Sequence, residues 1–260
     1  MLDSLYIAAT GLGAQQSRID AVSNNVANVN TYAYKKQRIN FEDVFYRPLV
    51  QAPGVGTAAV LPQPVGLGVA VSGTQTVFTA GDLAQTNNPL DVAIKGDGFF
   101  EVEMPDGTSA YTRLGSLRLN DQGEFTTQDG ERLKARFVVP SDATAVTIAS
   151  TGQVTATVAG QDKPVSLGNF ELANFVNPTG LTPLGGGLFA ATNDSGPAFV
   201  DDPGQQGLGT LNQGYLEASN VDLNSELVDL VLAQQAYQLN SKVVQVSDDI
   251  LSTIVNFRRS

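Results

Sequence analysis

Cysteine, histidine and tryptophan are all absent from this 260-residue sequence. Without cysteine the chain has no disulfide, no thiolate nucleophile and no Cys-based metal site. Without histidine it lacks the commonest general base near neutral pH and the commonest zinc ligand. Most hydrolase triads and transition-metal sites are therefore excluded, and we expect no catalytic residue, no metal site and no cofactor.

Charge is also scarce, and what there is has mostly one sign. Charged residues make up 16% of the chain, which carries a net charge of −11, whereas about a quarter is usual. The only basic cluster, Lys35, Lys36 and Arg38, is far from the basic stripe that nucleic acid requires. No apolar stretch reaches the ~20 residues of a membrane span. Residues 1–16 carry Asp3 where a signal peptide is basic. We therefore expect no nucleic-acid partner, no direct membrane span and no cleaved signal peptide.

The N-terminal segment has the pattern of an amphipathic helix. Apolar residues recur there every seven positions: Leu5, Leu12, Ile19 and Val26. This spacing predicts a narrow apolar seam along one face of a helix. Gly11 and Gly13 weaken that helix by roughly 1 kcal/mol each relative to Ala. The polar runs 23–25 and 28–30 then favour a stop, because their side chains compete for backbone hydrogen bonds.

The C-terminal segment predicts a longer helix. Asp222 or Asn224 can cap its first turn, and Arg258 and Arg259 follow at the end where cations are favoured. About 36 residues at ~1.5 Å each give a helix of roughly 54 Å. Its candidate interface residues step by three, four or seven positions: Tyr237, Leu239, Val243, Val246, Ile250, Leu251 and Ile254. The two terminal segments are therefore predicted to form a coiled-coil-like pair.

Between the two ends the apolar period changes to two. Phe100, Val102 and Met104 alternate with Glu101 and Glu103, and a Pro-Asp-Gly-Thr turn follows. Similar short alternating runs continue beyond residue 170, which predicts a mainly antiparallel β central domain. The fold class is thus α+β. The predicted organisation is an N-terminal helical segment (1–34), an extended connector and insertion (35–70), an all-β domain (71–210), and a C-terminal connector with the long helix (211–260).

The stretch 48–81 contains no charged residue and is rich in Pro and Gly. One interpretation is a flexible linker. The other is an arm that lies against a neighbouring subunit, where the lack of charge lowers the cost of desolvation. The sequence leaves both open.

Two carboxylates are the remaining route to an enzyme, since glycoside hydrolysis needs only a pair. Glu101 and Glu103 share one face of a predicted strand, and Asp201-Asp202 and Asp248-Asp249 are adjacent pairs. The plain interpretation of all three is a solvated surface. A carboxylate-dependent cell-wall hydrolase and an adhesin-like binding module are the alternatives from other functional classes.

The apolar faces of the two predicted terminal helices also allow two interpretations. They can form an internal helix pair packed on the β domain, or they can join neighbouring copies. The second is favoured because the apolar stripe of the C-terminal helix is wider than a single partner needs, so its surface would remain exposed in an isolated chain.

A motif spans the end of the first predicted helix and the residues that follow it: Asn24, Asn25, Ala27, Asn28, Asn30, Thr31 and Lys35. It resembles the N-terminal signature of a known family, the bacterial flagellar rod and hook proteins. Ala33 stands where the family usually has Gly, and Tyr34 where it has Phe. Because Gly tolerates a positive φ that Ala resists, we expect unusual backbone geometry at Ala33. Two further blocks, 81–115 and 213–242, resemble the family in the same order.

The resemblance implies a structural subunit of the flagellar basal body that polymerises into the hollow distal rod, the driveshaft that transmits torque through the periplasm. A hook or proximal rod subunit is the alternative within the family. The implied partners are further copies of the chain, the proximal rod and hook proteins, the peptidoglycan and outer-membrane ring proteins, and the flagellar type III export apparatus. The implied location is the periplasm-spanning rod.

For assembly, we predict that both terminal segments are largely disordered in the free chain, because isolated helices interrupted by Gly and Asn are marginal. They would fold on incorporation. Leu5, Leu12, Ile19 and Val26 would then face Val243, Val246, Ile250 and Ile254.

Overall fold

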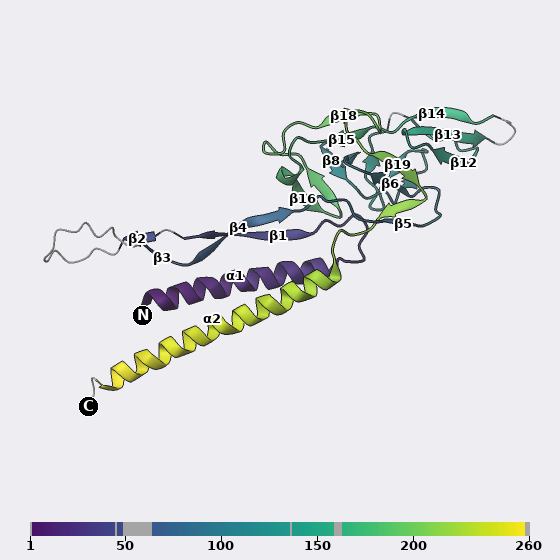
Figure 1. The fold of residues 1–260 in the computed structure, drawn as a ribbon. Coiled ribbons are helices and arrows are strands. Elements are labelled where there is room, and N and C mark those ends of the chain that lie inside the picture. The colour runs from purple at the N-terminus through teal and green to yellow at the C-terminus, as the bar shows by residue number, and fades with distance from the viewer. Residues whose placement is uncertain (1, 45, 49–63, 136, 159–162, 258–260) are drawn as a thin grey trace. The chain divides into compact units, whose positions relative to one another are not determined.

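The computed structural model describes residues 2–44, 46–48, 64–135, 137–158 and 163–257 (Figure 1). It divides into two compact units. Unit 1 comprises residues 1–27, 37–76 and 222–260, and unit 2 comprises residues 28–36 and 77–221. Two helices and many antiparallel strands confirm the predicted α+β class. Within the described ranges, neither helix is long and apolar enough to cross a membrane.

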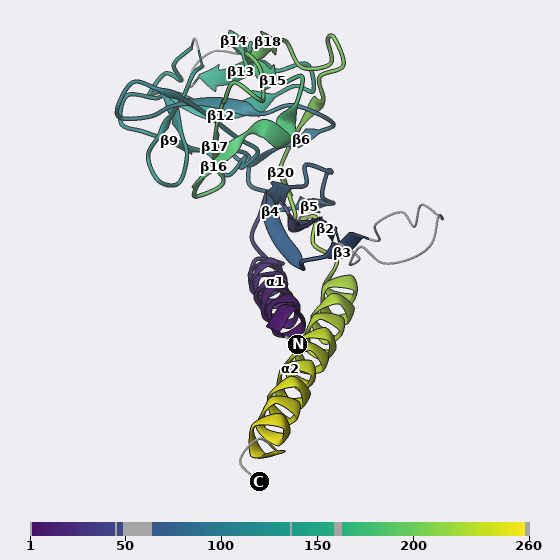
Figure 2. The ribbon, with the colours of Figure 1, turned by 90° about the vertical axis from the view of Figure 1, so that its left-hand side faces the viewer.

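Unit 1 contains both helices. Helix α1 spans Leu2–Ala27 and helix α2 spans Leu223–Phe257. The two lie side by side and run antiparallel, as Figures 1 and 2 show. The predicted stop is confirmed at the second polar run, because α1 passes through residues 23–25 and ends at Ala27, directly before residues 28–30. Asn25 lies within the helix, and its amide bonds to Gln37 and Glu226 in other elements.

The predicted cap of the second helix is confirmed at Asp222. Its carboxylate accepts hydrogen bonds from the Asn224 N–H at 3.0 Å and from the Ser225 hydroxyl at 2.8 Å. The Asp222 carbonyl oxygen accepts the Glu226 N–H at 3.0 Å. The first-turn N–H groups that have no partner inside the helix are thus partly satisfied.

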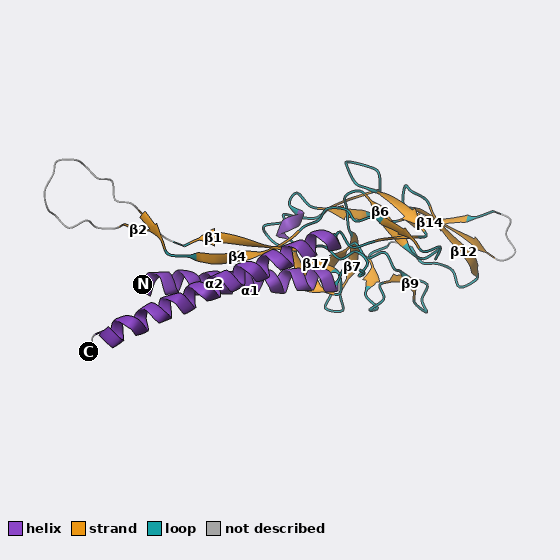
Figure 3. Ribbon diagram, turned by 60° about the horizontal axis from the view of Figure 1, so that its bottom comes forward, coloured by secondary structure: helices purple, strands orange, loops and turns teal. Residues whose placement is uncertain are grey.

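A two-stranded ribbon completes unit 1 (Figure 3). Strand β1 (Gln37–Asp43) pairs antiparallel with β4 (Val69–Thr76), and β2 (Tyr46–Pro48) pairs with β3 (Pro64–Gly66). The ribbon contacts α1, where the Val69 N–H donates to the Thr10 hydroxyl at 3.4 Å. The described parts of the uncharged 48–81 stretch therefore include ordered strand, which argues against a flexible linker there. Residues 49–63 lie outside the described residues.

Unit 2 is built from short strands. They are β5 (Leu83–Gln85), β6 (Val92–Lys95), β7 (Phe100–Glu103), β8 (Ser109–Thr112), β9 (Arg118–Leu119), β10 (Phe125–Thr126), β11 (Arg132–Leu133), β12 (Ala143–Ile148), β13 (Gln153–Val158), β14 (Val165–Asn169), β15 (Leu172–Asn174), β16 (Thr182–Gly185), β17 (Leu188–Ala190), β18 (Phe199–Asp201), β19 (Thr210–Gln213) and β20 (Tyr215–Glu217), with a 3-10 turn at Pro178–Gly180. Every named strand pair is antiparallel.

The largest sheet of unit 2 has seven strands in the order β16-β17-β8-β7-β11-β10-β9. A three-stranded sheet follows the order β12-β13-β14, and the pairs β15-β18, β19-β6 and β20-β5 complete the unit. The pair β20-β5 joins residues 83–85 to residues 215–217, just before α2 begins. The end of unit 2 that leads into α2 is therefore held by strand pairing.

The core of unit 2 follows the period-two pattern. On β7, Phe100 and Val102 are buried, whereas Glu103 is exposed and Glu101 is partly exposed. A second cluster gathers aromatic rings in edge-to-face contacts, with Phe99, Phe175 and Phe189 among them. Such contacts add about 0.5–1.5 kcal/mol per pair beyond burial.

Candidate functional site

Asn25 joins three elements of unit 1. Its Nδ2 donates to Oε2 of Glu226 in α2 at 3.0 Å and to the Gln37 carbonyl oxygen in β1 at 2.9 Å. Its Oδ1 accepts the Gln37 N–H at 2.9 Å. Asn25 and Glu226 are each 1% exposed. The end of α1 is thus held to both α2 and β1 by directional bonds that are shielded from water.

The contact between α1 and α2, which we call the seam, continues with polar and small residues. Arg18 donates to Asp229 at 2.8 Å, at an edge where both side chains are 37% exposed. Gly11 lies so close to α2 that a Cβ placed there would be 2.8 Å from Nδ2 of Asn240. Ala233 is fully buried. The helices approach closely here because the facing side chains are small.

The apolar residues predicted on α1 lie beside this seam. Leu5, Leu12, Ile19 and Val26 are all partly buried. Among the described side chains of α1, the buried apolar ones are Ala8, Ala14 and Val22. The seven-residue apolar spacing therefore identifies a half-buried edge of α1. The seam itself contains the residues one position earlier, which are Gly11, Arg18 and Asn25.

The apolar residues predicted on α2 are mostly exposed. Tyr237, Leu239, Val243, Val246, Ile250 and Ile254 are 38–66% exposed, and only Leu251 is partly buried. Within one chain, α1 therefore leaves about half of Val243, Val246 and Ile250 uncovered, and the pairing expected on incorporation stays a prediction. Helix α1 packs instead on the seam, where the residues of α2 are smaller and more polar.

Seven of the exposed apolar residues of α2 share one face of the helix, whereas others such as Leu227 and Val231 lie on different faces. We call this shared face the outer stripe, and its members are Val228, Leu232, Leu239, Val243, Val246, Ile250 and Ile254. Steps of three, four and seven place them on one side of the helix, roughly a quarter turn from the seam. Sequence analysis missed Val228 and Leu232, although the same spacing extends to them. Large uncovered apolar faces mark sites of interaction.

The family motif divides between the two units. Asn25 belongs to unit 1 and Lys35 to unit 2. Between them, the Thr31 hydroxyl donates to Oδ1 of Asn28 at 3.1 Å, and the Thr31 N–H donates to the Asn28 carbonyl oxygen at 3.1 Å, which forms a turn. The remaining motif residues, Asn24, Ala27 and Asn30, are exposed.

Ala33 has the unusual geometry expected of it. Its φ is +57°, in the left-handed region that favours Gly. The residue is only 4% exposed, and its N–H donates to the Glu217 carbonyl oxygen at 2.8 Å. The buried position and this hydrogen bond hold the backbone in a conformation that Ala alone disfavours.

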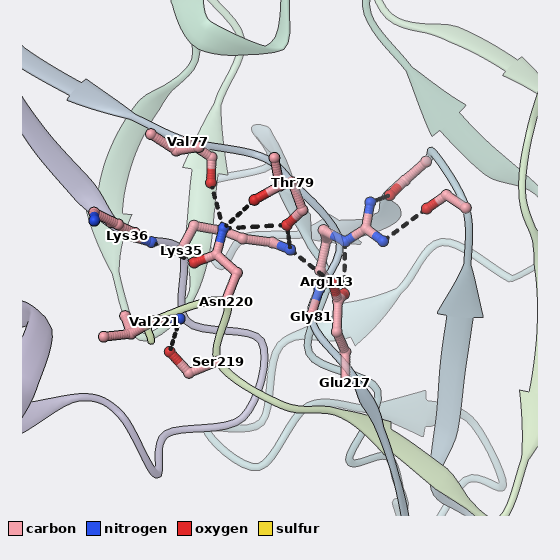
Figure 4. Close-up of polar contacts among 12 residues, drawn as sticks. Lys35, Lys36, Val77, Thr79, Gly81, Arg113, Glu217, Ser219, Asn220 and Val221 are labelled. Atoms are coloured by element: carbon pink, nitrogen blue, oxygen red, sulfur yellow. Dashed lines mark hydrogen bonds and ion pairs between the residues drawn. The ribbon is translucent and has the colours of Figure 1, made fainter. Parts of the chain in front are cut away.

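The side chain of Glu217 belongs to a cluster of buried charged residues in unit 2 (Figure 4). Oε1 of Glu217 is 2.6 Å from Nζ of Lys35, and Oε2 is 2.7 Å from Nε of Arg113. All three side chains are at most 2% exposed. Backbone groups provide further hydrogen bonds to two of these side chains. The Lys35 ammonium donates to the Thr79 carbonyl oxygen, and the Gly81 N–H donates to the Glu217 carboxylate.

Arg113 has further partners of its own. Its terminal nitrogens donate to the carbonyl oxygens of Gly98 at 3.1 Å and Gly96 at 2.8 Å, and its guanidinium lies 5.7 Å from the centre of the Phe99 ring. A buried cation with this many partners is well compensated. The sequence contained no signal that would pair Glu217 with Arg113 or Lys35.

Asn220 shares the Thr79 carbonyl oxygen with Lys35 and adds further contacts to the cluster. Its Oδ1 accepts the Lys36 N–H at 2.7 Å, and its Nδ2 donates to the carbonyl oxygens of Val77 at 2.8 Å and Thr79 at 3.1 Å. The Asn220 N–H donates to the Tyr34 carbonyl oxygen at 3.4 Å. The segment that follows α1 and the segment that precedes α2 are thereby joined within unit 2.

The charges in the cluster shift one another's protonation. Burial and the nearby Arg113 charge lower the pKa of Lys35, and the pairing with Glu217 only partly opposes them. Burial acts to raise the pKa of Glu217, but the charges and hydrogen bonds of Arg113 and Lys35 outweigh it and hold that pKa below its usual value. Burial and the repulsion between the two cations thus lower the pKa of Lys35, and the attraction of both cations lowers the pKa of Glu217.

The carboxylates considered for catalysis have structural surroundings. Oε1 of Glu101 accepts Lys134 at 2.8 Å, and Oδ2 of Asp201 accepts Gln206 at 2.7 Å. Asp248 and Asp249 lie exposed on α2. Among the described residues, no group of three or more acidic residues could hold a metal ion. Glu101 and Asp201 thus take part in contacts that belong to the fold, and the Asp248-Asp249 pair lies on a helix surface.

Comparison with known proteins gives consistent matches along the chain. Residues 5–35 match the model of the flagella basal body rod protein family, residues 93–156 match the D1 domain of the flagellar hook protein FlgE/F/G family, and residues 212–257 match the C-terminal model of the flagellar basal body rod FlgEFG proteins.

Full-length relatives are similar throughout. The chain is 41% identical to the flagellar basal-body rod protein FlgG of Agrobacterium fabrum, over 96% of this chain and 97% of the relative. It is 39% identical to FlgG of Borreliella burgdorferi and 35% identical to FlgG of Bacillus subtilis, each over the whole of both chains.

These matches confirm the resemblance seen in the sequence and the predicted role, a structural subunit of the distal rod that is not an enzyme. Nothing in them points to a cell-wall hydrolase. Proteins of this kind belong to the basal body and polymerise with other axial proteins. The chain belongs to the FlgG family of flagellar basal-body rod proteins.

Proposed function

We propose that the outer stripe of α2 is the surface through which copies of this chain polymerise into the hollow distal rod. The observation that carries this is the stripe itself, seven Val, Leu and Ile side chains that the chain's own α1 leaves 46–66% exposed. A contact that does not close into a ring continues as a helix of subunits.

Burial of the outer stripe supplies the driving force. Complete burial of one Val, Leu or Ile side chain is worth about 1.5–3 kcal/mol. About half of each stripe residue is already covered, so each contributes roughly 1 kcal/mol on assembly. The predicted interface residues of α1, Leu5, Leu12, Ile19 and Val26, are partly covered by the same measure. They would complete their burial in the rod.

The terminal helices are proposed to become fully ordered on incorporation. Gly11 and Gly13 lower the helical propensity of α1, and α2 exposes a long apolar face. Both features make isolated helices marginal, and contacts with neighbouring copies would remedy both. The segment 1–34 and the segment 211–260 would form the tube core, with the central β domain outside it.

The wider role follows from the family. The rod would span the periplasm, meet the proximal rod at one end and the hook at the other, and turn inside the peptidoglycan and outer-membrane rings. The chain would reach its site through the flagellar type III export apparatus, without a cleaved signal peptide. Transmission of torque requires a stiff polymer and no chemistry.

Sedimentation of concentrated full-length protein tests the proposal. Val243→Ser with Ile250→Ser is expected to raise the concentration needed for polymer at least tenfold, since two lost contacts are worth roughly 2 kcal/mol. Gln238→Ser with Gln245→Ser is the matched control, because these exposed residues have the same spacing on another face of α2. Equal polymerisation of both double variants would refute the role of the stripe.

A further inference from the structure

The two faces of α2 differ in a way that the polymer interface alone does not explain. The outer stripe is the more apolar face, yet α1 of the same chain packs on the seam. Hydrophobic burial is non-directional, so it does not by itself choose a partner or a register. The choice must come from groups with specific geometry.

The seam contains such groups at a regular spacing. Asn25, Arg18 and Gly11 step back by seven along α1, while Glu226, Ala233 and Asn240 step forward by seven along α2. Two of these opposed pairs are in direct proximity: the Asn25 amide bonds to Glu226 at 3.0 Å, and Gly11 lies against Asn240. One antiparallel register satisfies both.

We propose that the buried Asn25–Glu226 pair is the specificity determinant of the terminal helices. It selects the α1 of the same chain, in a single register, as the partner of the α2 seam. The outer stripe is thereby left for a neighbouring copy. This inference rests on the proposed function only in that last step, because the selection of α1 acts within one chain.

The cost of a wrong pairing supports this role. A shift of α1 by one heptad would place Asn25 opposite Ala233, which has no side-chain group to accept its bond. The buried Glu226 carboxylate would lose the Asn25 amide. A buried polar group without its partner is strongly unfavourable, and a single buried Asn is known to set register in coiled coils.

The bonds to β1 strengthen the selection. Asn25 exchanges two hydrogen bonds of 2.9 Å with the backbone of Gln37, twelve residues further along the same chain. Helix α1 and strand β1 therefore meet Glu226 as one piece. An α1 from another copy would have to bring its own β1 with it.

Disulfide trapping tests the proposal, since the chain has no native cysteine. Cysteines are introduced by Gly11→Cys and Asn240→Cys, full-length protein is oxidised in dilute solution and as polymer, and non-reducing gels separate internal links from links between chains. The otherwise unchanged chain should give internal links. Asn25→Leu with Glu226→Leu should reduce the internal fraction about tenfold, as a change of 1.4 kcal/mol would, and disulfide-linked dimers should appear.

Glu226→Gln is the matched control, because it makes the same change in charge but keeps an oxygen that accepts the Asn25 amide. It should retain the internal link. An unchanged internal fraction in the double-Leu variant would overturn the proposal, as would absence of the internal link, or links only between chains, in the chain that keeps Asn25 and Glu226. If instead the proposed role of the outer stripe in polymerisation is wrong, the Val243→Ser, Ile250→Ser variant will polymerise normally and the internal link will be unaffected.

Discussion

The ammonium of Lys35 lies 2.6 Å from Oε1 of Glu217, although 182 residues separate the two along the chain. Lys35 lies on the segment that follows α1, and Glu217 ends β20, shortly before α2. One buried ion pair therefore joins, within unit 2, the two segments that lead to the terminal helices. Arg113 adds a second cation, so Glu217 is the single carboxylate on which the cluster depends.

Replacement of that carboxylate should be costly. Glu217→Gln leaves the buried cations of Lys35 and Arg113 without their counter-charge, and we expect a loss of about 3–5 kcal/mol in the free energy of unfolding. Urea denaturation of the full chain measures it. Glu101→Gln is the control, because its partner Lys134 is 59% exposed, and it should lose at most about 1 kcal/mol. Similar losses in both variants would contradict the structural role of the cluster.

The same cluster predicts how stability depends on pH. Glu217 has a folded pKa below its usual 4.5, so its contribution is complete above pH 4.5 and is lost as the pH falls through the lowered folded pKa. Lys35 has a folded pKa below its usual 10.5. The unfolded state therefore holds more protons between the lowered value and 10.5, and stability rises with pH in that interval.

Urea midpoints measured from acidic to alkaline pH test these directions. The acid loss should be smaller in Glu217→Gln, which has no carboxylate to protonate at this position. Lys35→Met should remove the alkaline rise. A Glu217→Gln variant with the full acid loss would show that other carboxylates account for the effect.

The left-handed backbone at Ala33 predicts an unusual response to substitution. A positive φ costs an Ala roughly 1–2 kcal/mol, and Gly avoids that cost but gives up about 0.4–1 kcal/mol in chain entropy and a small buried methyl. Ala33→Gly should therefore change stability by only a few tenths of a kcal/mol. Ala110→Gly, at an equally buried strand position, should lose roughly 1–2 kcal/mol. Thermal unfolding compares them, and equal losses would refute strain at Ala33.

Two glycines of α1 provide a test of the close helix contact. Gly13 has no heavy atom within 4 Å of its would-be Cβ, whereas Gly11 has Nδ2 of Asn240 at 2.8 Å. Gly13→Ala should stabilise α1 by about 1 kcal/mol through helix propensity. Gly11→Ala should stabilise it less, because Asn240 must move. Hydrogen exchange of the α1 amides measures both, and an equal gain in protection would show that Gly11 is not constrained by α2.

Much of this architecture could be read from residues in order along the chain. Seven-residue apolar spacing predicts both helices, the Asp222 cap predicts where α2 begins, and alternation around Phe100 predicts the β region. These signals are local, since each depends on side chains within a few turns or a single strand. The motif from Asn24 to Lys35, together with the blocks at 81–115 and 213–242, likewise indicates the family.

Which faces meet was decided only by the tertiary structure. Residues 11, 18 and 25 each directly precede an apolar heptad member. One step along a helix rotates the side-chain direction by about 100°, which separates the seam from the half-buried edge beside it. The local pattern assigns Leu12, Ile19 and Val26 to an interface. It is silent on whether Gly11, Arg18 and Asn25 will face α2, because that depends on where Glu226 and Asn240 lie.

The sequence by itself thus determined the elements, the fold class, the family and the exclusion of most enzyme chemistry. Only the tertiary structure decided that the seam consists of polar and small residues, that the outer stripe remains exposed, and that Lys35, Arg113 and Glu217 share one buried site. The physical reason is separation along the chain. Helix propensity and alternation act between neighbours, whereas burial and ion pairing depend on groups that only folding brings together.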